Sequence, residues 1–186
     1  MKEFPITIGI DDAKFELKSD LRTTYLIGVV CQGTRVVRVV KTSIYIDGDN
    51  ATDAVIRLIQ QNDKHLQYVL TDTITFGGFN IIDLQEIYKN TNKPIIAVTE
   101  RPVALDSVKE ALLKQFPSNY TSKLEKIIKA GYLYETKIAT AGGNSTIYFH
   151  MIGMTTQEVE KLFQKLCIDS KLPEPLRLAH VIGKMF

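Results

Sequence analysis

The segment Ile6-Thr7-Ile8-Gly9-Ile10-Asp11-Asp12 is where the fold prediction begins. Its β-branched residues are typical of a strand, and the run ends at two carboxylates. Two further strand-like runs follow, over residues 25–31 and 35–46, and the second lies between Gly33 and Asp47-Gly48. Because the breaks between these runs are short enough for hairpins, we predict an antiparallel meander of three strands.

The hydrophobic period changes after the meander. Asn50 is a candidate helix cap in front of apolar residues at helical spacing, and residues 67–70 form another strand-like run. A second helix is predicted beyond, with Asn80 and Asp83 in its cap and first-turn positions, and residues 94–98 form a fifth strand. Strands that alternate with helices in this way pair in parallel through right-handed crossovers.

The last third of the chain is predicted to be mostly helical, with one hairpin. Helices are expected over residues 105–116 and 124–130, hairpin strands over 132–140 and 146–152, and two final helices after a Thr155–Glu158 capping box and at Pro175. The elements together predict an α/β fold, in which an antiparallel three-stranded meander is followed by parallel strands and helices flank the mixed sheet. No linker or repeat divides the chain, so we expect one domain over residues 1–186.

The composition is that of an ordinary globular protein. The chain has 186 residues, of which 45% are hydrophobic and 24% charged, and this argues against disorder. The net charge of +2 is too small to indicate nucleic-acid binding and does not exclude it. Cys31 and Cys167 are too few for a disulfide framework or a zinc cluster, so we expect buried free thiols. We find no apolar run of membrane length and no signal peptide, and we expect a cytoplasmic protein with no membrane partner.

Carboxylates follow two of the predicted strands. Asp11 ends the first strand and Asp72 follows the fourth. If these strands are neighbours, both carboxylates enter one cleft, where they repel each other unless a proton or a cation neutralises them. Mg²⁺ or Mn²⁺ would do so, since such ions prefer oxygen ligands. The alternative is that each acid is a solvated turn residue or a helix cap.

Other polar residues of the predicted loops leave two interpretations open. Asp49 is either a helix cap or a third acid facing the same cleft. The Gly77-Gly78 turn before Asn80 is either a simple tight turn or a place where backbone N–H groups approach an anion. His180 lies on the last helix with Arg177 one turn before it. Either both are ordinary surface residues, or His180 serves catalysis and Arg177 contacts nucleic acid.

Several of these segments occur in an order that resembles endonuclease V, which has a ribonuclease H-like fold. They are the acid of Gly9-Ile10-Asp11, the Tyr45-Ile46-Asp47-Gly48 turn, the strand ending at Asp72, the strand 94–98 and the ending 173–180. The chain resembles more closely an uncharacterised, mostly archaeal family grouped beside endonuclease V. The segments that indicate this family are Ile10-Asp11-Asp12, residues 47–52 and residues 75–80.

The resemblance implies a chemistry for particular residues. Endonuclease V cuts a nucleic-acid strand near a deaminated base, inosine, and uses Mg²⁺. By position, its two metal aspartates match Asp11 and Asp72, and the histidine near its C-terminal end matches His180. Its third acid has no direct match, and Asp49 is the nearest candidate.

The chain departs from endonuclease V at two places. Endonuclease V has a lysine at the end of the fifth strand, where this chain has Glu100 followed by Arg101. Its Tyr-Ile-Pro-Gly type wedge reads Tyr45-Ile46-Asp47-Gly48 here, without the proline. We expect Arg101 to hold a phosphate oxygen in place of the lysine.

Two functional hypotheses follow. The first is a metal-dependent phosphodiesterase that acts on nucleic acid, with Asp11, Asp72, Asp49 and His180 as its catalytic residues and Mg²⁺ or Mn²⁺ bound by Asp11 and Asp72. In this hypothesis Arg101, Arg177 and the Gly77–Asn80 turn contact the nucleic acid. The second is a non-catalytic protein of the same fold that binds a nucleotide or nucleic acid without cutting it, and the acidic Glu100 motivates this alternative.

Overall fold

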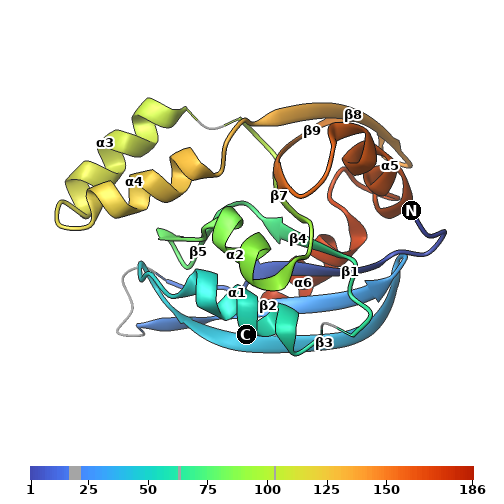
Figure 1. Cartoon of the computed structure of the whole chain (residues 1–186), viewed down its shortest axis with the longest axis horizontal. Helices are drawn as coiled ribbons and strands as arrows, with labels where there is room; N and C mark the ends of the chain where they lie inside the picture. The colour runs from blue at the N-terminus through green and yellow to red at the C-terminus, as the bar shows by residue number, and fades with distance from the viewer. Residues whose placement is uncertain (17–21, 63, 103) are drawn as a thin grey trace.

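The computed structural model describes residues 1–16, 22–62, 64–102 and 104–186. Its centre is a seven-stranded sheet with the strand order β3-β2-β1-β4-β7-β9-β8 (Figure 1). The strands are β1 (Ile6–Asp12), β2 (Thr23–Gln32), β3 (Arg35–Tyr45), β4 (Tyr68–Asp72), β7 (Ile95–Thr99), β8 (Tyr134–Thr140) and β9 (Gly143–Ile152).

The pairing of the strands confirms the predicted mixed sheet. β1, β2 and β3 form an antiparallel meander, whereas β1 pairs with β4, and β4 with β7, in parallel. The hairpin of β8 and β9 extends the sheet by antiparallel pairing of β9 with β7. β1 and β4 are therefore central neighbours, as the prediction of one carboxylate cleft requires.

Helices cover both faces of the sheet. They are α1 (Ala51–Gln60), α2 (Leu84–Thr91), α3 (Leu105–Gln115), α4 (Tyr120–Lys129), α5 (Thr156–Leu166) and α6 (Glu174–Gly183). The first two pack against one face, and α5 and α6 pack against the other. The antiparallel pair α3–α4 projects from the body beyond the upper end of β7 in the view of Figure 1.

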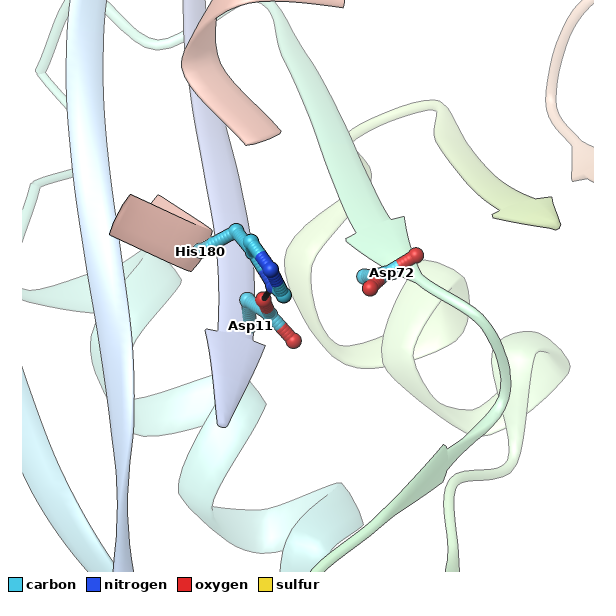
Figure 2. Close-up of side chains that lie close together, drawn as sticks. All are labelled: Asp11, Asp72 and His180. Carbon is cyan, nitrogen blue, oxygen red and sulfur yellow. Dashed lines mark hydrogen bonds and ion pairs between the residues drawn. The ribbon is translucent and has the colours of Figure 1, made fainter. Parts of the chain in front are cut away.

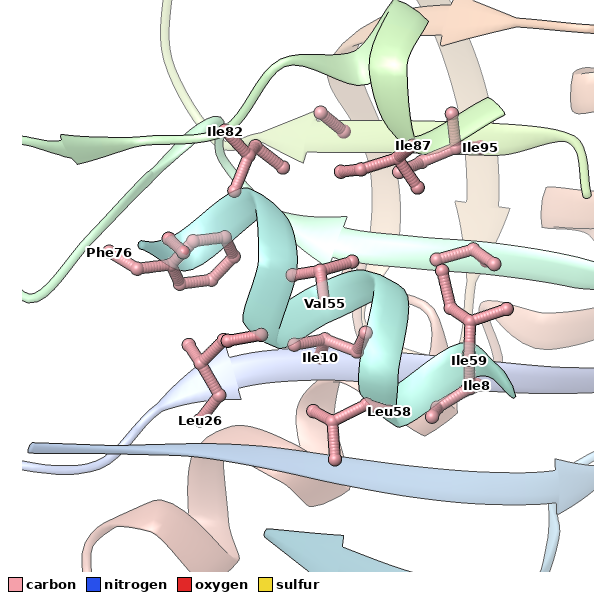
Figure 3. Packing of buried hydrophobic residues seen from close by; sticks show 14 of the residues in the cluster. Ile8, Ile10, Leu26, Val55, Leu58, Ile59, Phe76, Ile82, Ile87 and Ile95 are labelled. Atoms are coloured by element: carbon pink, nitrogen blue, oxygen red, sulfur yellow. The ribbon is translucent and has the colours of Figure 1, made fainter. Parts of the chain in front are cut away.

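Alternating side chains of the central strands supply both layers of the core. Ile8 and Ile10 of β1 and Val69 of β4 face α1 and α2, and they belong to the larger apolar cluster drawn in Figure 3. Leu70 of β4 and Ile96 of β7 point to the opposite face and pack with α5. Because successive strand residues alternate between faces, the buried runs of β1 and β4 serve two layers at once.

The segment between β4 and α2 differs from the prediction. Asn80 is not a helix cap, because it lies in a two-residue strand, β6 (Asn80–Ile81), which pairs with β5 (Thr75–Phe76). Helix α2 begins after Asp83, whose side chain accepts a hydrogen bond from the N–H of Glu86. The Thr155–Glu158 capping box before α5 is confirmed.

Helix α6 lies unusually close to β1. A Cβ atom on Gly9 would lie 2.3 Å from the backbone carbon of Pro175, so only glycine allows this approach. The C-terminal turn is equally tight, since a Cβ on Gly183 would lie 2.7 Å from the carbonyl oxygen of Asp12. The helix is thereby held against β1 from Gly9 to Asp12. Among the described residues, no helix has both the length and the apolar character needed to cross a membrane.

Candidate metal centre

Asp11 and Asp72 converge at the ends of two parallel strands. Ile10 of β1 is in register with Thr71 of β4, so the next residue of each strand is an aspartate that projects to the face covered by α6. Figure 2 shows both carboxylates beside the ends of their strands, with the imidazole of His180 next to Asp11. The predicted convergence of the two acids is present in the structure.

His180 completes the group from α6. Its Nδ1 lies 2.8 Å from Oδ2 of Asp11, in a hydrogen bond. One potential ligand atom from each of Asp11, Asp72 and His180 lies within 4.8 Å of the other two. The side chain of Asp11 is only 5% exposed, whereas that of His180 is 48% exposed. The group thus opens to solvent on the side of the imidazole.

The electrostatics of the group favour a cation. Burial, and after it the neighbouring charge of Asp11, together raise the pKa of Asp72 to about 7. Burial also raises the pKa of Asp11, against the lowering effect of its hydrogen bond with His180. Two neighbouring carboxylates are hard to ionise at the same time, because their negative charges repel each other. A divalent cation between them neutralises both charges. The donor set of two carboxylates and one imidazole fits Mg²⁺ or Mn²⁺.

The burial of Asp72 and its repulsion by Asp11 predict that the ionised Asp72 destabilises the metal-free protein. The folded-state pKa of about 7 lies above the ordinary value of 3.8, so the folded state binds more protons between these values. The contribution of Asp72 to stability in chelator should therefore fall as the pH rises from about 4 to 7. The variant Asp72→Asn should unfold at a temperature a few degrees higher than wild type at pH 7.5, and thermal melts in chelator at pH 5 and 7.5 measure this. A lower melting temperature for Asp72→Asn at pH 7.5 would contradict it.

Asp12 points to the opposite face from Asp11 and has a different role. Its Oδ2 accepts a hydrogen bond of 2.6 Å from the N–H of Gly77. The carbonyl of Gly77 in turn accepts from the N–H of Asp47. The Gly77 amide is therefore committed within the protein, although the sequence suggested that it could approach an anion. Its φ of +50° explains the glycine.

The other residues predicted to contact nucleic acid have varied surroundings. Asn80 is fully buried, and its side-chain amide bonds the backbone of Tyr45 and Ala51, so it supports the loops instead of facing solvent. Arg177 makes two hydrogen bonds of 2.7 Å to the carboxylate of Glu174. Arg101 is exposed and Gly78 half-buried. The accessible members of this set are thus Arg101, Gly78 and the paired Arg177, whose side chain is 37% exposed.

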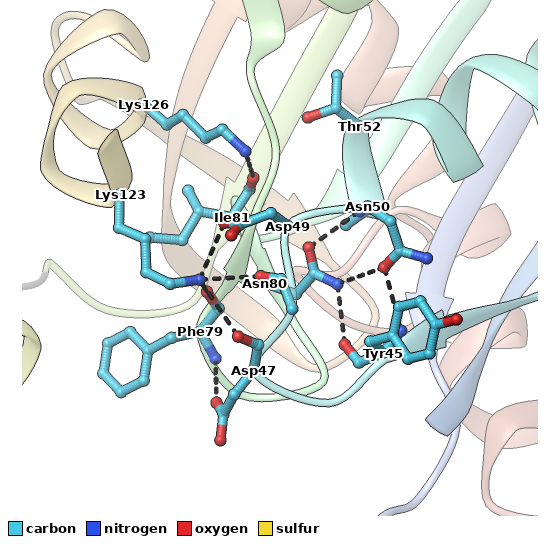
Figure 4. Close-up of polar contacts among 12 residues, drawn as sticks. Tyr45, Asp47, Asp49, Asn50, Thr52, Phe79, Asn80, Ile81, Lys123 and Lys126 are labelled. Carbon is cyan, nitrogen blue, oxygen red and sulfur yellow. Dashed lines mark hydrogen bonds and ion pairs between the residues drawn. The ribbon is translucent and has the colours of Figure 1, made fainter. Parts of the chain in front are cut away.

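Lys123 has a structural role that was not predicted from the sequence. It is fully buried, and its Nζ donates to the carbonyl oxygens of Asp47, Gly48 and Phe79 at 3.3, 2.8 and 2.7 Å (Figure 4). It also forms an ion pair of 3.1 Å with Asp49. One ammonium group from α4 therefore joins the loop after β3 to the loop after β5. Lys123 lies on the same face of α4 as Tyr120 and Ile127, and this helical spacing could have predicted that it is buried.

The structure does not bring Asp49 into the carboxylate–imidazole group. The group comprises Asp11, Asp72 and His180, and Asp49 instead faces Lys123. The helix-cap alternative does not apply either, because Asn50 occupies the cap position of α1.

The variant Asp49→Asn tests this placement. An asparagine still offers an oxygen to Lys123, and the carbonyl partners of the ammonium remain. We expect metal-dependent activity within about twofold of wild type and a small loss of stability, because the carboxylate is about half exposed. Loss of Mn²⁺ binding in this variant, measured by calorimetry, would identify Asp49 as a metal ligand after all.

Glu100 follows β7 and borders the group. Its negative charge adds to the raised pKa of Asp72. Lys171, from the segment between α5 and α6, donates to the Glu100 carbonyl at 3.1 Å and lies 3.9 Å from its carboxylate. A positive charge therefore reaches this edge of the sheet from a distant part of the chain.

An apolar cavity adjoins the same edge of the sheet. It has a volume of about 510 Å³ and lies between the ends of β4 and β7 and the helices α3 and α4. Thr73, the neighbour of Asp72, contributes to its wall together with Thr75, Thr99 and Phe79. Apolar walls with a few hydroxyl groups suit a flat, mostly apolar ligand group.

Comparisons with known proteins support a nuclease-like relationship. The model of a family described as Endonuclease dU matches residues 6–186. A UPF0215 protein of Nanoarchaeum equitans is 37% identical over 99% of this chain and 89% of its own length. A UPF0215 protein of Pyrococcus horikoshii is 34% identical over 95% of this chain and 89% of its own.

Solved structures agree with the ribonuclease H-like fold. A protein of unknown function from Archaeoglobus fulgidus superposes with a TM-score of 0.83 at 28% identity, over 96% of both chains. Endonuclease V of Ciona intestinalis, solved with DNA that contains inosine, gives a TM-score of 0.59 at 14% identity, over 95% of this chain and 82% of that one. The second likeness establishes a shared fold.

Proposed function

The chain belongs to the Endonuclease dU family, and from this membership and the geometry of the carboxylate pair we propose that it is a metal-dependent endonuclease acting on nucleic acid. The observation that carries the proposal is the convergence of Asp11, Asp72 and His180 within 4.8 Å at the ends of two central parallel strands. Fold alone would not suffice, because one fold hosts many functions.

In this proposal each residue of the group has a distinct role. Asp11 and Asp72 hold Mg²⁺ or Mn²⁺ through carboxylate oxygens. When bound, such an ion polarises a phosphate oxygen and lowers the pKa of a water molecule. His180 contacts Asp11 through Nδ1, which leaves Nε2 to orient a water molecule or to carry a proton. Arg101 and Lys171 supply positive charge near Glu100, where endonuclease V has its lysine.

The family description and the structural neighbours indicate which substrates to compare first. The family description reads Endonuclease dU, and endonuclease V of Ciona intestinalis was solved with inosine-containing DNA. We propose a strand that carries a deaminated base as the substrate class. The test incubates the protein with labelled strands that differ at one position only, carrying uracil, inosine or the ordinary base, in Mg²⁺, Mn²⁺ or chelator.

Cleavage that requires the metal and the deaminated base supports the proposal. Cleavage that continues in chelator would overturn the metal-dependent mechanism. Retention of a labelled strand without any product in Mg²⁺ or Mn²⁺ favours the second candidate, a non-catalytic nucleic-acid-binding protein. The acidic Glu100 beside Asp72 is the observation that keeps this alternative in view.

A further inference from the structure

We propose that a single strand of nucleic acid leaves the metal centre along a basic and aromatic track formed by the end of β1, the end of α6 and the neighbouring part of β2 and β3. The track consists of Lys14, Phe15, Tyr25, Lys41, Lys184 and Phe186. This proposal rests on the proposed function, since it names the surface that binds the strand on one side of the cleaved bond.

The first part of the track is a hollow that shares His180 with the metal centre. Its volume is about 490 Å³, and its wall includes Lys14, Phe15 and Lys184 as well as His180. The N–H of Lys14 donates to the carbonyl of Gly183 at 3.2 Å, so the two segments that carry the lysines are joined. A phosphodiester that continues from the metal centre past the exposed imidazole therefore meets two exposed ammonium groups.

The acidic residue Asp12 in the wall of the hollow repels an anion only weakly. The Oδ2 of its carboxylate is engaged by the Gly77 amide on the opposite face of β1. The two lysines thus dominate the charge that the hollow presents. Positive charge along a groove binds the phosphates of a nucleic-acid backbone whatever the base sequence is.

The second part of the track continues directly from the first. The carbonyl of Tyr25 accepts a hydrogen bond of 2.7 Å from the N–H of Ala13, which places Tyr25 beside the hollow. The Lys41 ammonium lies 4.4 Å from the centre of the Tyr25 ring and 4.2 Å from that of Phe186. Both rings are exposed, at 40% and 55%. The two rings also meet edge to face, with their centres 6.0 Å apart. Partly exposed aromatic rings interleaved with lysines suit unstacked bases and phosphates together, as in surfaces that bind single strands.

The test measures binding of a fluorescein-labelled single-stranded DNA, the matching RNA and the matching duplex DNA by anisotropy, in chelator and at several salt concentrations. The variant Lys14→Gln/Lys184→Gln removes two charges. We expect about a tenfold loss of affinity for the single strands, and a slope of log affinity against log salt that is smaller by about 1.4. The matched control Lys89→Gln/Lys161→Gln removes two exposed charges from α2 and α5 and should match wild type.

The aromatic residues are tested separately. Tyr25→Ala and Phe186→Ala should each weaken single-strand binding by at least about fivefold, with the salt dependence unchanged, because stacking involves no counterion release. If the variants lose affinity for the DNA strand and for the RNA strand to the same extent, the surface recognises the phosphates and bases that both share. This outcome supports the track.

The outcomes separate this proposal from the proposed function. If the track variants bind the single strands as wild type does while wild type still cleaves in Mn²⁺, the track is wrong and the nuclease proposal stands. A loss confined to duplex DNA would also overturn the assignment to a single strand. If wild type neither binds nor cleaves any strand, the proposed function fails and this inference fails with it.

Discussion

Replacing Asp11 by alanine is expected to abolish Mg²⁺- or Mn²⁺-dependent cleavage, with a rate reduced by at least about 10³-fold. The physical reason is that Asp11 both faces Asp72 and orients His180, so its loss removes a metal ligand and the partner of the imidazole. The fold should survive, because burial already penalises the charged form of this carboxyl group and raises its pKa.

Three measurements check this expectation. Cleavage of a labelled strand in Mn²⁺ gives the rate, calorimetric titration with Mn²⁺ gives the affinity for the ion, and circular dichroism confirms the fold. Asp106→Ala is the matched control, since its carboxylate is 93% exposed on α3 and should have no effect. An Asp11→Ala protein that cuts at the wild-type rate would remove Asp11 from the mechanism and place the reaction elsewhere.

The largest effect on stability is expected for Lys123→Met. The methionine would fill most of the volume but would leave three carbonyl oxygens and the Asp49 carboxylate without their donor. Each buried acceptor left without a donor costs about 1–3 kcal/mol, so the three carbonyl oxygens together give an expected loss of about 3–5 kcal/mol. For a chain of this length that corresponds to a melting temperature lower by roughly 10 °C.

Lys126→Met provides the control on the same helix. Lys126 donates to a single carbonyl, that of Ile81, at 3.1 Å, so we expect a loss of about 1 kcal/mol. Urea denaturation of both variants gives the two free energies of unfolding. Equal values for the two lysines would show that the Lys123 network adds nothing beyond one ordinary hydrogen bond.

Local patterns were sufficient for much of the fold. The β-branched runs at β1, β2 and β3 and the switch to helical spacing after Asn50 predicted the mixed sheet, because strand and helix periodicities are properties of short segments. The Thr155–Glu158 capping box was readable for the same reason, since both partners lie within one turn. Asn80 was misread as a cap, because its partners Tyr45 and Ala51 lie about 30 residues away along the chain.

The candidate site divides in the same way. Asp11 and Asp72 were predictable as a pair, because acids at the ends of adjacent parallel strands must lie at one edge of the sheet. His180 was placed through the resemblance to endonuclease V, and no local pattern related it to Asp11, 169 residues away. The partners of Lys123, and the hollow that Lys14 and Lys184 share, could not be predicted from the sequence. The contacts involved join loops and helices that are far apart along the chain.

The order of residues along the chain therefore settled which segments become strands and helices, and which strand ends carry acids, since these depend on neighbours within a few positions. Tertiary packing decided that Asp12 turns away to the Gly77 amide, that Asp49 pairs with Lys123, and that α6 lies close enough on Gly9 to bring an imidazole to Asp11. Those outcomes depend on the approach of distant backbones, and steric fit between whole elements determines that approach.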